Sequence, residues 1–257
     1  MRRFLICGNW KMTKTISETK ELIGEILENM PKTKNEVVVC PSYMALESAC
    51  EMTEGTRVQV GAQNMHYDDK GPYTGEVSAK MLTEVGVKYV IIGHSSRRAD
   101  DNDTDQKINK KIKKAVESGL IPILCVGESA KEREANRTYR VIKKQLMRDL
   151  EGIEDATSIV VAYEPLWAIS DGVNPAPTPT LEEINTVNSG IKRVLRQMFG
   201  KEPVKKMRVL YGGSVTPENS AEIMSIRSVN GVLIGGASLK ADKFIGIVNS
   251  VVKQRNE

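Results

Sequence analysis

The hydrophobic positions of the chain form short, continuous apolar runs that alternate with longer amphipathic segments. Eight such runs occur, at residues 4–7, 37–40, 58–60, 89–92, 121–126, 159–162, 207–211 and 231–234. Continuous apolar runs of this length are typical of strands that are buried on both faces. Between them, apolar residues recur at helical spacing, as Ile108, Ile112 and Ala115 do after the fourth run. Thr180 and Glu183 form a capping-box pattern that predicts the start of another helix after the sixth run.

Repeated alternation of strand and helix predicts an α/β fold with a parallel sheet covered by helices. Eight units favour a closed eight-stranded parallel (β/α)8 barrel. The competing fold is a doubly wound open sheet that binds a dinucleotide. It would need a G-x-G-x-x-G motif after the first strand, where the chain has Gly8, Asn9, Trp10 and Lys11. No linker divides the chain, and the proline-rich stretch 174–180 lies inside one unit, so we expect a single barrel domain over residues 1–257.

Polar residues of complementary chemistry follow four of the apolar runs. Asn9 and Lys11 follow the first run, His94 the fourth, Glu164 the sixth and Ser214 the seventh. In a (β/α)8 barrel the carboxyl ends of the strands lie on one face and form the active site, so these residues are expected to converge. A carboxylate base, a hydrogen-bond donor and a cation are the groups needed to move a proton next to a carbonyl.

Glu164 is the strongest candidate for a catalytic base. Pro165 directly follows it and biases Glu164 toward extended backbone geometry, which directs the side chain away from a helical path. A glutamate alone at a strand end is more often a solvated carboxylate, and a lone Lys11 or His94 is more often a surface or structural residue. The combination of these residues on successive strand ends favours the catalytic interpretation.

Glycine pairs follow the last two strands and predict a phosphate site. Gly212 and Gly213 precede Ser214, and Gly235 and Gly236 follow the eighth run. Glycine lets backbone amides approach an anion closely, and barrels commonly bind phosphate between these two loops. Either pair alone would be read as a tight turn.

Composition limits the possible partners. The 37 basic and 33 acidic side chains are nearly balanced and are spread along the chain, which disfavours nucleic acid as a partner. The two histidines, His66 and His94, and the four cysteines have no metal-site spacing, so neither a metal nor any other cofactor is expected. The N-terminal residues are too short an apolar stretch for a signal peptide or membrane span. Reduced cysteines and a cytoplasmic location are therefore expected.

The motifs at the strand ends resemble those of the triosephosphate isomerase family over the whole chain, in order. They are GNWKM at 8–12, AQN at 62–64, TGEVS at 74–78, GHS at 93–95, CVGE at 125–128, AYEPLWAI at 162–169, YGGSV at 211–215 and GGASL at 235–239. The resemblance implies a TIM barrel and an isomerase of glycolysis and gluconeogenesis. The implied reaction interconverts dihydroxyacetone phosphate and D-glyceraldehyde 3-phosphate through an enediolate.

Roles for individual residues also come from the resemblance, since this family is a known example of tuned acid and base groups. It implies that Glu164 is the base, that a neutral His94 polarises the carbonyl oxygen, and that Asn9 donates to the same oxygen. Lys11 would offset negative charge. The residues implied to bind the substrate phosphate are Ser170, Ser214, Gly235 and Gly236.

The resemblance further implies a mobile lid and a homodimer. The lid residues would be Pro165, Leu166, Trp167, Ala168, Ile169, Asp171 and Gly172. Residues 62–76 resemble a loop that inserts into a partner subunit, with Thr74 near its tip and His66 as an interface or surface residue. The implied partners are thus a small phosphorylated sugar and a second copy of the chain, with neither nucleic acid nor a membrane.

Two departures from the family pattern leave alternatives open. Ser96 stands where the family has glutamate in the motif G-H-S-E-R-R. In the lid, the family typically has I-G-T-G-K-x-A, whereas here Ile169 is followed by Ser170, Asp171 and Gly172 and then by the sequence VNPA. A second hypothesis is therefore an isomerase of a tetrulose phosphate, L-erythrulose 1-phosphate or D-erythrulose 4-phosphate. A third is a catalytically idle paralogue with a binding role, which the four intact catalytic candidates argue against.

Overall fold

Eight parallel strands close into a barrel in the order β1 to β8, as the sequence predicts. The computed structural model describes residues 3–169 and 177–253, and side chains up to residue 251. The strands are β1 Leu5–Asn9, β2 Glu36–Cys40, β3 Val58–Ala62, β4 Tyr89–Ile92, β5 Ile121–Val126, β6 Val160–Tyr163, β7 Arg208–Gly213 and β8 Gly231–Ile234. The first strand pairs with both β2 and β8, which closes the ladder.

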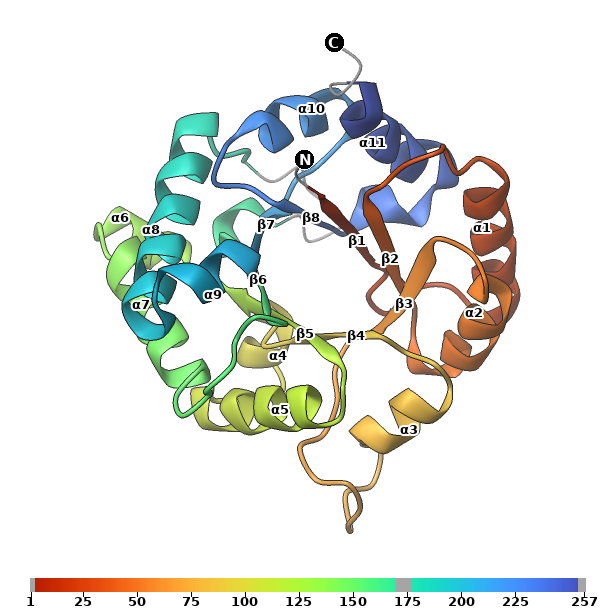
Figure 1. The fold of residues 1–257 in the computed structure, drawn as a ribbon, viewed down its shortest axis with the longest axis horizontal. Helices are drawn as coiled ribbons and strands as arrows, with labels where there is room; N and C mark the ends of the chain where they lie inside the picture. The colour runs from red at the N-terminus through yellow and green to blue at the C-terminus, as the bar shows by residue number, and fades with distance from the viewer. Residues whose placement is uncertain (1–2, 170–176, 254–257) are drawn as a thin grey trace.

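Helices surround the barrel and cover its outer face (Figure 1). They are α1 Ile16–Glu28, α2 Leu46–Thr53, α3 Ala79–Glu84, α4 Ser95–Ala99, α5 Asp105–Glu117, α6 Ala130–Glu134, α7 Thr138–Asp149, α8 Leu181–Phe199, α9 Lys201–Lys206, α10 Pro217–Ser225 and α11 Ala241–Lys253. Three 3-10 helices, η1 Tyr43–Ala45, η2 Leu166–Ala168 and η3 Gly236–Leu239, lie in the connections. The loop between β3 and α3 projects away from the barrel (Figure 1).

The local signals in the sequence match these elements closely. Thr180 caps α8 as expected, because its side chain accepts the Glu183 backbone N–H while the Glu183 carboxylate accepts the Thr180 N–H. The expected bounds of β4, β5 and β8 are confirmed. The strands β1, β3 and β7 each run two residues further than expected, into Asn9, Ala62 and Gly213. Hydrogen bonds between the backbones of neighbouring strands do not require apolar side chains, so the apolar run underestimates how far the strand extends.

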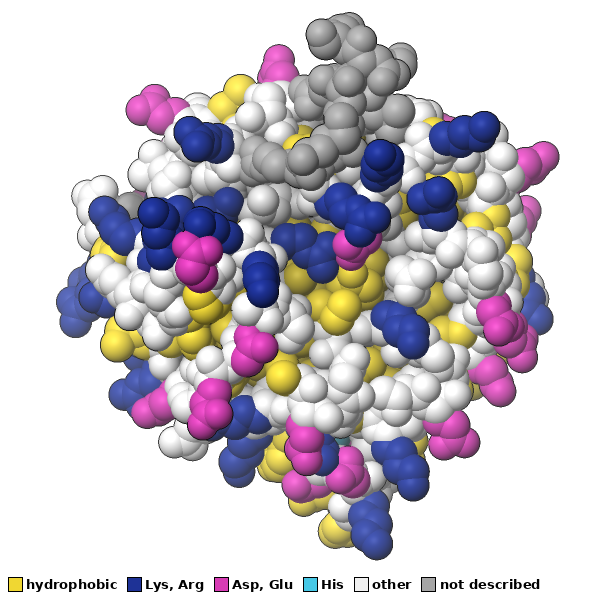
Figure 2. All heavy atoms as spheres, viewed as in Figure 1, with side chains coloured by type: hydrophobic (Ala, Val, Ile, Leu, Met, Phe, Trp, Pro, Cys, Tyr) yellow, Lys and Arg dark blue, Asp and Glu magenta, His cyan; other side chains and the backbone are white. Residues whose placement is uncertain are grey.

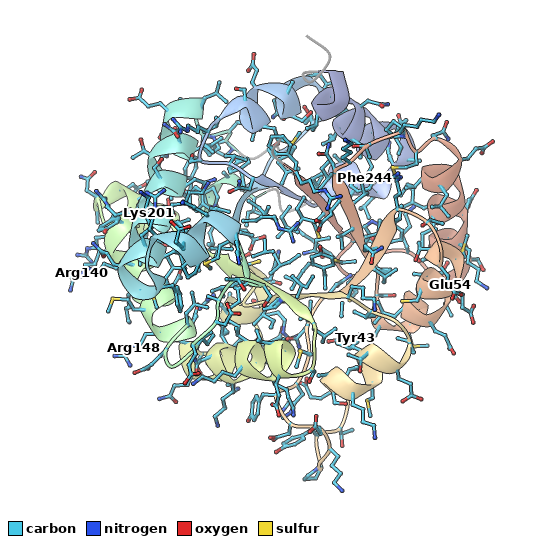
Figure 3. The ribbon with its side chains drawn as sticks, viewed as in Figure 1. Tyr43, Glu54, Arg140, Arg148, Lys201 and Phe244 are labelled. Carbon is cyan, nitrogen blue, oxygen red and sulfur yellow. The ribbon has the colours of Figure 1, made fainter. Side chains whose placement is uncertain are left out.

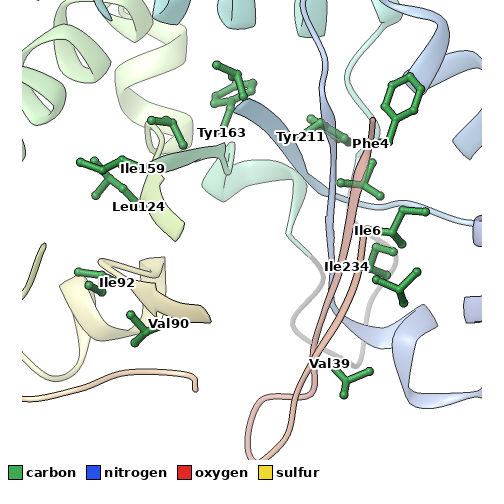
Figure 4. Close-up of a cluster of buried hydrophobic side chains, with 14 of the residues drawn as sticks. Phe4, Ile6, Val39, Val90, Ile92, Leu124, Ile159, Tyr163, Tyr211 and Ile234 are labelled. Atoms are coloured by element: carbon green, nitrogen blue, oxygen red, sulfur yellow. The ribbon is translucent and has the colours of Figure 1, made fainter. Parts of the chain in front are cut away.

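Alternate strand residues belong to two separate buried clusters. One cluster contains Cys7, Val38, Val160 and Ala162 and consists of strand residues, which places it inside the barrel. The other contains the remaining strand positions, such as Ile6, Val90 and Leu124 (Figure 4). Residues of the surrounding helices complete this second cluster. Because side chains on a strand alternate between faces, this pattern fixes the direction of the residue that follows each strand.

Phe244 shows how the helices pack on the barrel. It lies on the inner side of α11, fully buried, whereas Arg140 and Arg148 of α7 extend outward (Figure 3). A Cβ built on Gly8 of β1 would lie 3.4 Å from the Phe244 ring, so the strand and the helix are in close contact at this point.

Charged side chains of both signs are interspersed over the face seen in Figure 2. This agrees with the near balance of 37 basic and 33 acidic residues. Within the described residues, every helix is too short or too polar to span a membrane.

We expect Phe244→Ala to lower the free energy of unfolding by about 3–5 kcal/mol, because it removes a fully buried aromatic side chain and leaves a cavity. Urea denaturation at fixed protein concentration measures the change. Arg140→Ala, on the exposed face of α7, is the control and should change the value by about 0.5 kcal/mol or less. Equal losses in the two variants would contradict the packing described above.

Candidate active site

The expected site residues meet in one cavity of about 290 Å³. Asn9, Lys11, His94 and Glu164 all line it, although they follow three different strands. The lining also includes the expected phosphate-site residues Ser214, Gly235 and Gly236. Further lining residues were not singled out by the sequence, namely Val215, Thr216, Pro217, Glu218, Ala237, Lys240 and Lys243.

Glu164 points into this cavity because of its position after β6. Val160 and Ala162 face the barrel interior, so Glu164 continues the same inward series. Its backbone N–H donates to the Val126 carbonyl at 2.8 Å, which extends the ladder by one residue. Glu164 is only 5% exposed, and among the described residues its Oε2 has no hydrogen-bond partner. The carboxylate is thus largely withdrawn from solvent, and Oε2 is itself a buried atom.

Two glycines on neighbouring strand ends make room for Glu164. A Cβ on Gly212 would lie 2.9 Å from the Glu164 Cγ, and a Cβ on Gly127 would lie 1.8 Å from its carbonyl oxygen. The second distance is a collision with backbone, which cannot rotate away. The glycine in β7 thus makes room for the glutamate side chain, and the glycine after β5 makes room for the backbone at position 164.

His94 faces Glu164 from the end of β4. Gly93, with φ of 73°, reverses the chain there, so His94 becomes the N-cap of α4. The backbone N–H of Ser96 donates to His94 Nδ1 at 3.3 Å, and His94 Nε2 lies 3.5 Å from Glu164 Oε1. Since a backbone N–H can only donate, Nδ1 is the acceptor nitrogen and Nε2 carries the proton toward the cavity.

Lys11 and Asn9 are held by a distorted turn after β1. Lys11 has φ of 53°, in the left-handed region that non-glycine residues seldom occupy. The turn is stabilised because Asn9 Oδ1 accepts the Lys11 backbone N–H at 3.0 Å and Gln63 Nε2 donates to the Lys11 carbonyl at 2.7 Å. With its oxygen occupied, the Asn9 amide presents N–H donors elsewhere. A Cβ on Gly235 would lie 3.8 Å from Lys11 Nζ, so the ammonium lies beside the β8 glycines.

Backbone and lysine groups line the end of the cavity that is formed by the loops after β7 and β8. A Cβ on Gly236 would meet nothing within 4 Å, so this backbone faces open space. Lys240 and Lys243 also line the cavity and are exposed. Nothing in the sequence distinguishes these two from surface lysines, and only the fold brings them to the site.

Cys125 is a further neighbour that sequence reasoning placed only as a buried thiol. Burial raises the pKa of the Cys125 thiol well above its ordinary value, and the nearby charge of Glu164 raises it further. The thiol therefore stays neutral beside the carboxylate. Strand alternation predicts that the Cys125 side chain faces the barrel interior. Its position beside Glu164 depends on the register between the strands of the barrel.

The expected lid residues begin directly after Glu164. Leu166, Trp167 and Ala168 form η2, and Ile169 lines the cavity. Trp167 Nε1 donates to Glu128 Oε1 at 2.9 Å, which ties η2 to the end of β5. The Arg133 guanidinium lies over the Trp167 ring, 3.7 Å from its centroid. The other expected lid and phosphate residues, Ser170, Asp171 and Gly172, lie outside the described residues.

Two residues of the projecting loop, Thr74 and His66, differ in their exposure to solvent. Thr74 is exposed. The expectation of a surface position for His66 is wrong, because only 9% of this residue is exposed. Its ring stacks between Tyr67 and Tyr73, and its Nδ1 accepts the Asp68 backbone N–H at 3.0 Å. His66 therefore stabilises the loop internally.

A closed barrel with a carboxylate, an imidazole and an ammonium at the carboxyl ends of its strands defines a (β/α)8-barrel enzyme of proton-transfer chemistry. The family described as triosephosphate isomerase matches residues 4–251. The chain belongs to the triosephosphate isomerase family and is an isomerase.

Similar proteins cover nearly the whole chain. The triosephosphate isomerase of Alkaliphilus metalliredigens is 49% identical over 251 residues, which span 97% of this chain and 100% of that protein. That of Alkaliphilus oremlandii is 47% identical with the same coverage. The crystal structure of the Bartonella henselae triosephosphate isomerase is similar with a TM-score of 0.88 at 38% identity, covering 97% of this chain and 99% of that chain.

We expect Gly212→Ala to reduce kcat about 100-fold, because the added methyl group displaces the Glu164 side chain by the order of 1 Å. Steady-state isomerase assays measure the loss. Gly24→Ala in α1, where a Cβ would meet nothing within 4 Å, should retain wild-type kcat. Unchanged kcat in Gly212→Ala would show that Glu164 tolerates the displacement.

Proposed function

We propose that the protein interconverts dihydroxyacetone phosphate and D-glyceraldehyde 3-phosphate, with Glu164 as the base. The observation that supports this most directly is the pairing of Glu164 Oε1 with His94 Nε2 at 3.5 Å inside one cavity. A substrate carbon placed beside the carboxylate brings its carbonyl oxygen within reach of the imidazole N–H. Glu164 takes a proton from that carbon and returns it to the neighbouring one, while a hydroxyl proton passes from the oxygen of the first carbon to the oxygen of the second. The two transfers together exchange the aldehyde and ketone positions.

Charge that develops on the substrate oxygens is met by donors on β1 and β4. His94 Nε2–H donates to the oxygen of the enediolate, and the free amide N–H of Asn9 donates to the same region. The ammonium of Lys11 offsets negative charge in the transition state. Fixed donors in a largely buried site need no reorganisation when the charge forms, which is why such groups lower the barrier.

The substrate phosphate binds between the ends of β7 and β8 in this proposal. Ser214, Gly235 and Gly236 line that end of the cavity, and the glycines leave the backbone amides unobstructed. Lys11 beside Gly235 places a cation between the phosphate and the reacting carbons. Ser170 is proposed as a further phosphate contact from the lid.

Residues 165–172 act as a lid that closes over the substrate. Closure would exclude water and protect the enediolate from loss of phosphate. The Trp167–Glu128 hydrogen bond and the stacking of Arg133 hold the first part of this segment in its present position. Burial raises the pKa of Glu128, although its hydrogen bonds from Trp167 and Tyr163 oppose the shift.

The tetrulose phosphate alternative receives no support from the described cavity. It supposes that serine at position 96 enlarges the pocket, but neither Ser96 nor Arg97 is among the described residues that line the cavity. Arg97 is turned toward Asp101 and Asp103. A higher kcat/KM for L-erythrulose 1-phosphate or D-erythrulose 4-phosphate than for glyceraldehyde 3-phosphate would overturn the triose assignment.

We expect Glu164→Gln to lower kcat for glyceraldehyde 3-phosphate roughly 10²- to 10⁴-fold, since the amide cannot accept the substrate proton. A coupled assay for dihydroxyacetone phosphate measures the rate. Glu134→Gln, an exposed glutamate at the end of α6, is the matched control and should keep full activity. Wild-type rates in Glu164→Gln would refute the assigned base, and equal background in all preparations would refute the isomerase function.

We further propose a homodimer formed around the projecting loop. Several large apolar side chains are exposed, among them Met12 at 96%, Met44 at 79% and Met81 at 56%; Met81 lies in α3, the helix that follows the projecting loop. Exposed apolar area of this kind is typical of a protein interface. Thr74, which is exposed in this loop, contacts the second copy in this proposal. All four cysteines are free thiols, which suits a reducing compartment and supports a cytoplasmic location.

Sedimentation analysis should give a mass twice the 28.5 kDa of one chain. Thr74→Arg should shift the equilibrium toward monomer, because it introduces an unpaired charge into the interface. Lys201→Glu in α9 tests whether a charge change elsewhere has the same effect, and it should leave the mass unchanged. A monomeric wild-type protein at micromolar concentration would contradict the proposed dimer.

A further inference from the structure

Ser96 places two groups against the same nitrogen of His94. Its hydroxyl Oγ lies 2.9 Å from His94 Nδ1, and its backbone N lies 3.3 Å from that nitrogen. The family pattern that the chain resembles has a glutamate at this position, and an ionised glutamate can accept hydrogen bonds but cannot donate them. The serine therefore supplies a contact of different chemistry next to the imidazole.

The direction of the hydroxyl bond follows from its neighbours. The backbone N–H can only donate, so Nδ1 presents its lone pair, and the hydroxyl that approaches the same lone pair must donate as well. The reverse arrangement would put a proton on Nδ1 of a neutral ring and leave the Nε2 lone pair facing Glu164 Oε1 at 3.5 Å. Two acceptors would then face each other without a proton between them.

We propose that Ser96 is a positioning residue for the isomerase. Its hydroxyl fixes His94 in the tautomer with the proton on Nε2 and holds the ring toward the substrate. The inference rests on the proposed role of His94 in the reaction. The hydroxyl makes the shorter of the two contacts to Nδ1, so the backbone N–H alone holds the ring less firmly. Ser96 acts through His94 and lines no described part of the cavity itself.

The chain is well suited to a direct test because it has only two histidines. In protein labelled with 15N-histidine, the ring nitrogens of His66 and His94 can be resolved by long-range 1H–15N correlation. His66 Nδ1 accepts one backbone N–H, from Asp68, and no hydroxyl contact to it is found among the described residues. His66 thus serves as an internal reference for folding and for an Nδ1 with a single donor.

Three variants separate the hydroxyl from other effects. Ser96→Ala removes the donor, Ser96→Thr retains a hydroxyl, and Ser189→Ala removes an exposed serine hydroxyl of α8 as the control. We expect Ser96→Ala to shift the His94 Nδ1 resonance toward that of an acceptor with one donor, with the His66 signals unchanged. The value of kcat should fall roughly three- to tenfold with KM nearly constant, as for the loss of one hydrogen bond. Ser96→Thr should retain most of the wild-type kcat and a His94 Nδ1 resonance close to that of wild type. Ser189→Ala should match wild type in both quantities.

The proposal is overturned if Ser96→Ala leaves the Nδ1 resonance unchanged, or if the resonance moves while kcat stays at the wild-type value. It is also overturned if Ser96→Thr loses as much activity as Ser96→Ala, since the side chain would then act through its size. Failure of the proposed function is a separate result, because inactive wild-type protein would show it in the assay while the substrate-free spectra still report the hydrogen bond.

Discussion

Closure of the parallel ladder is the constraint on which the site depends. Because β1 bonds to both β2 and β8, no strand can shift along its neighbours by one residue without breaking the register around the ring. A shift of one residue in β6 would turn Glu164 from the cavity to the helix layer. The buried clusters on the two faces of the strands fix that register, so the hydrophobic packing far from the cavity determines where the carboxylate points.

Much of the fold could be predicted from the sequence because its signals are local and repeated. The apolar runs identify all eight strands, and the Thr180 capping box identifies the start of α8. The convergence of Asn9, Lys11, His94 and Glu164 follows from the topology of the barrel, since each comes after a strand that ends on the same face. The roles of these residues came from the family resemblance and stand as proposals.

Other features depend on contacts between residues that are distant in sequence, and no local pattern could reveal them. Lys240 and Lys243 look like ordinary surface lysines until α11 is placed beside the cavity. His66 was expected at an interface or at the surface because its loop resembles one that inserts into a partner subunit, yet its stacking with Tyr67 and Tyr73 buries it within its own chain. The hydroxyl contact of Ser96 depends on the turn at Gly93, which the letters GHSS alone do not specify.

The two glycines that surround Glu164 have a consequence for how such a site can be moved or can arise. The glutamate directly follows β6, but the space for its side chain is provided by β7 and the space for its backbone by the residue after β5. If a glutamate were introduced at the end of one strand of another barrel, Cβ atoms on the neighbouring strands would therefore occupy the space that it needs. The transferable unit is three adjacent strands, because the strand end that carries the acid needs the glycine after β5 for its backbone and the glycine in β7 for its side chain.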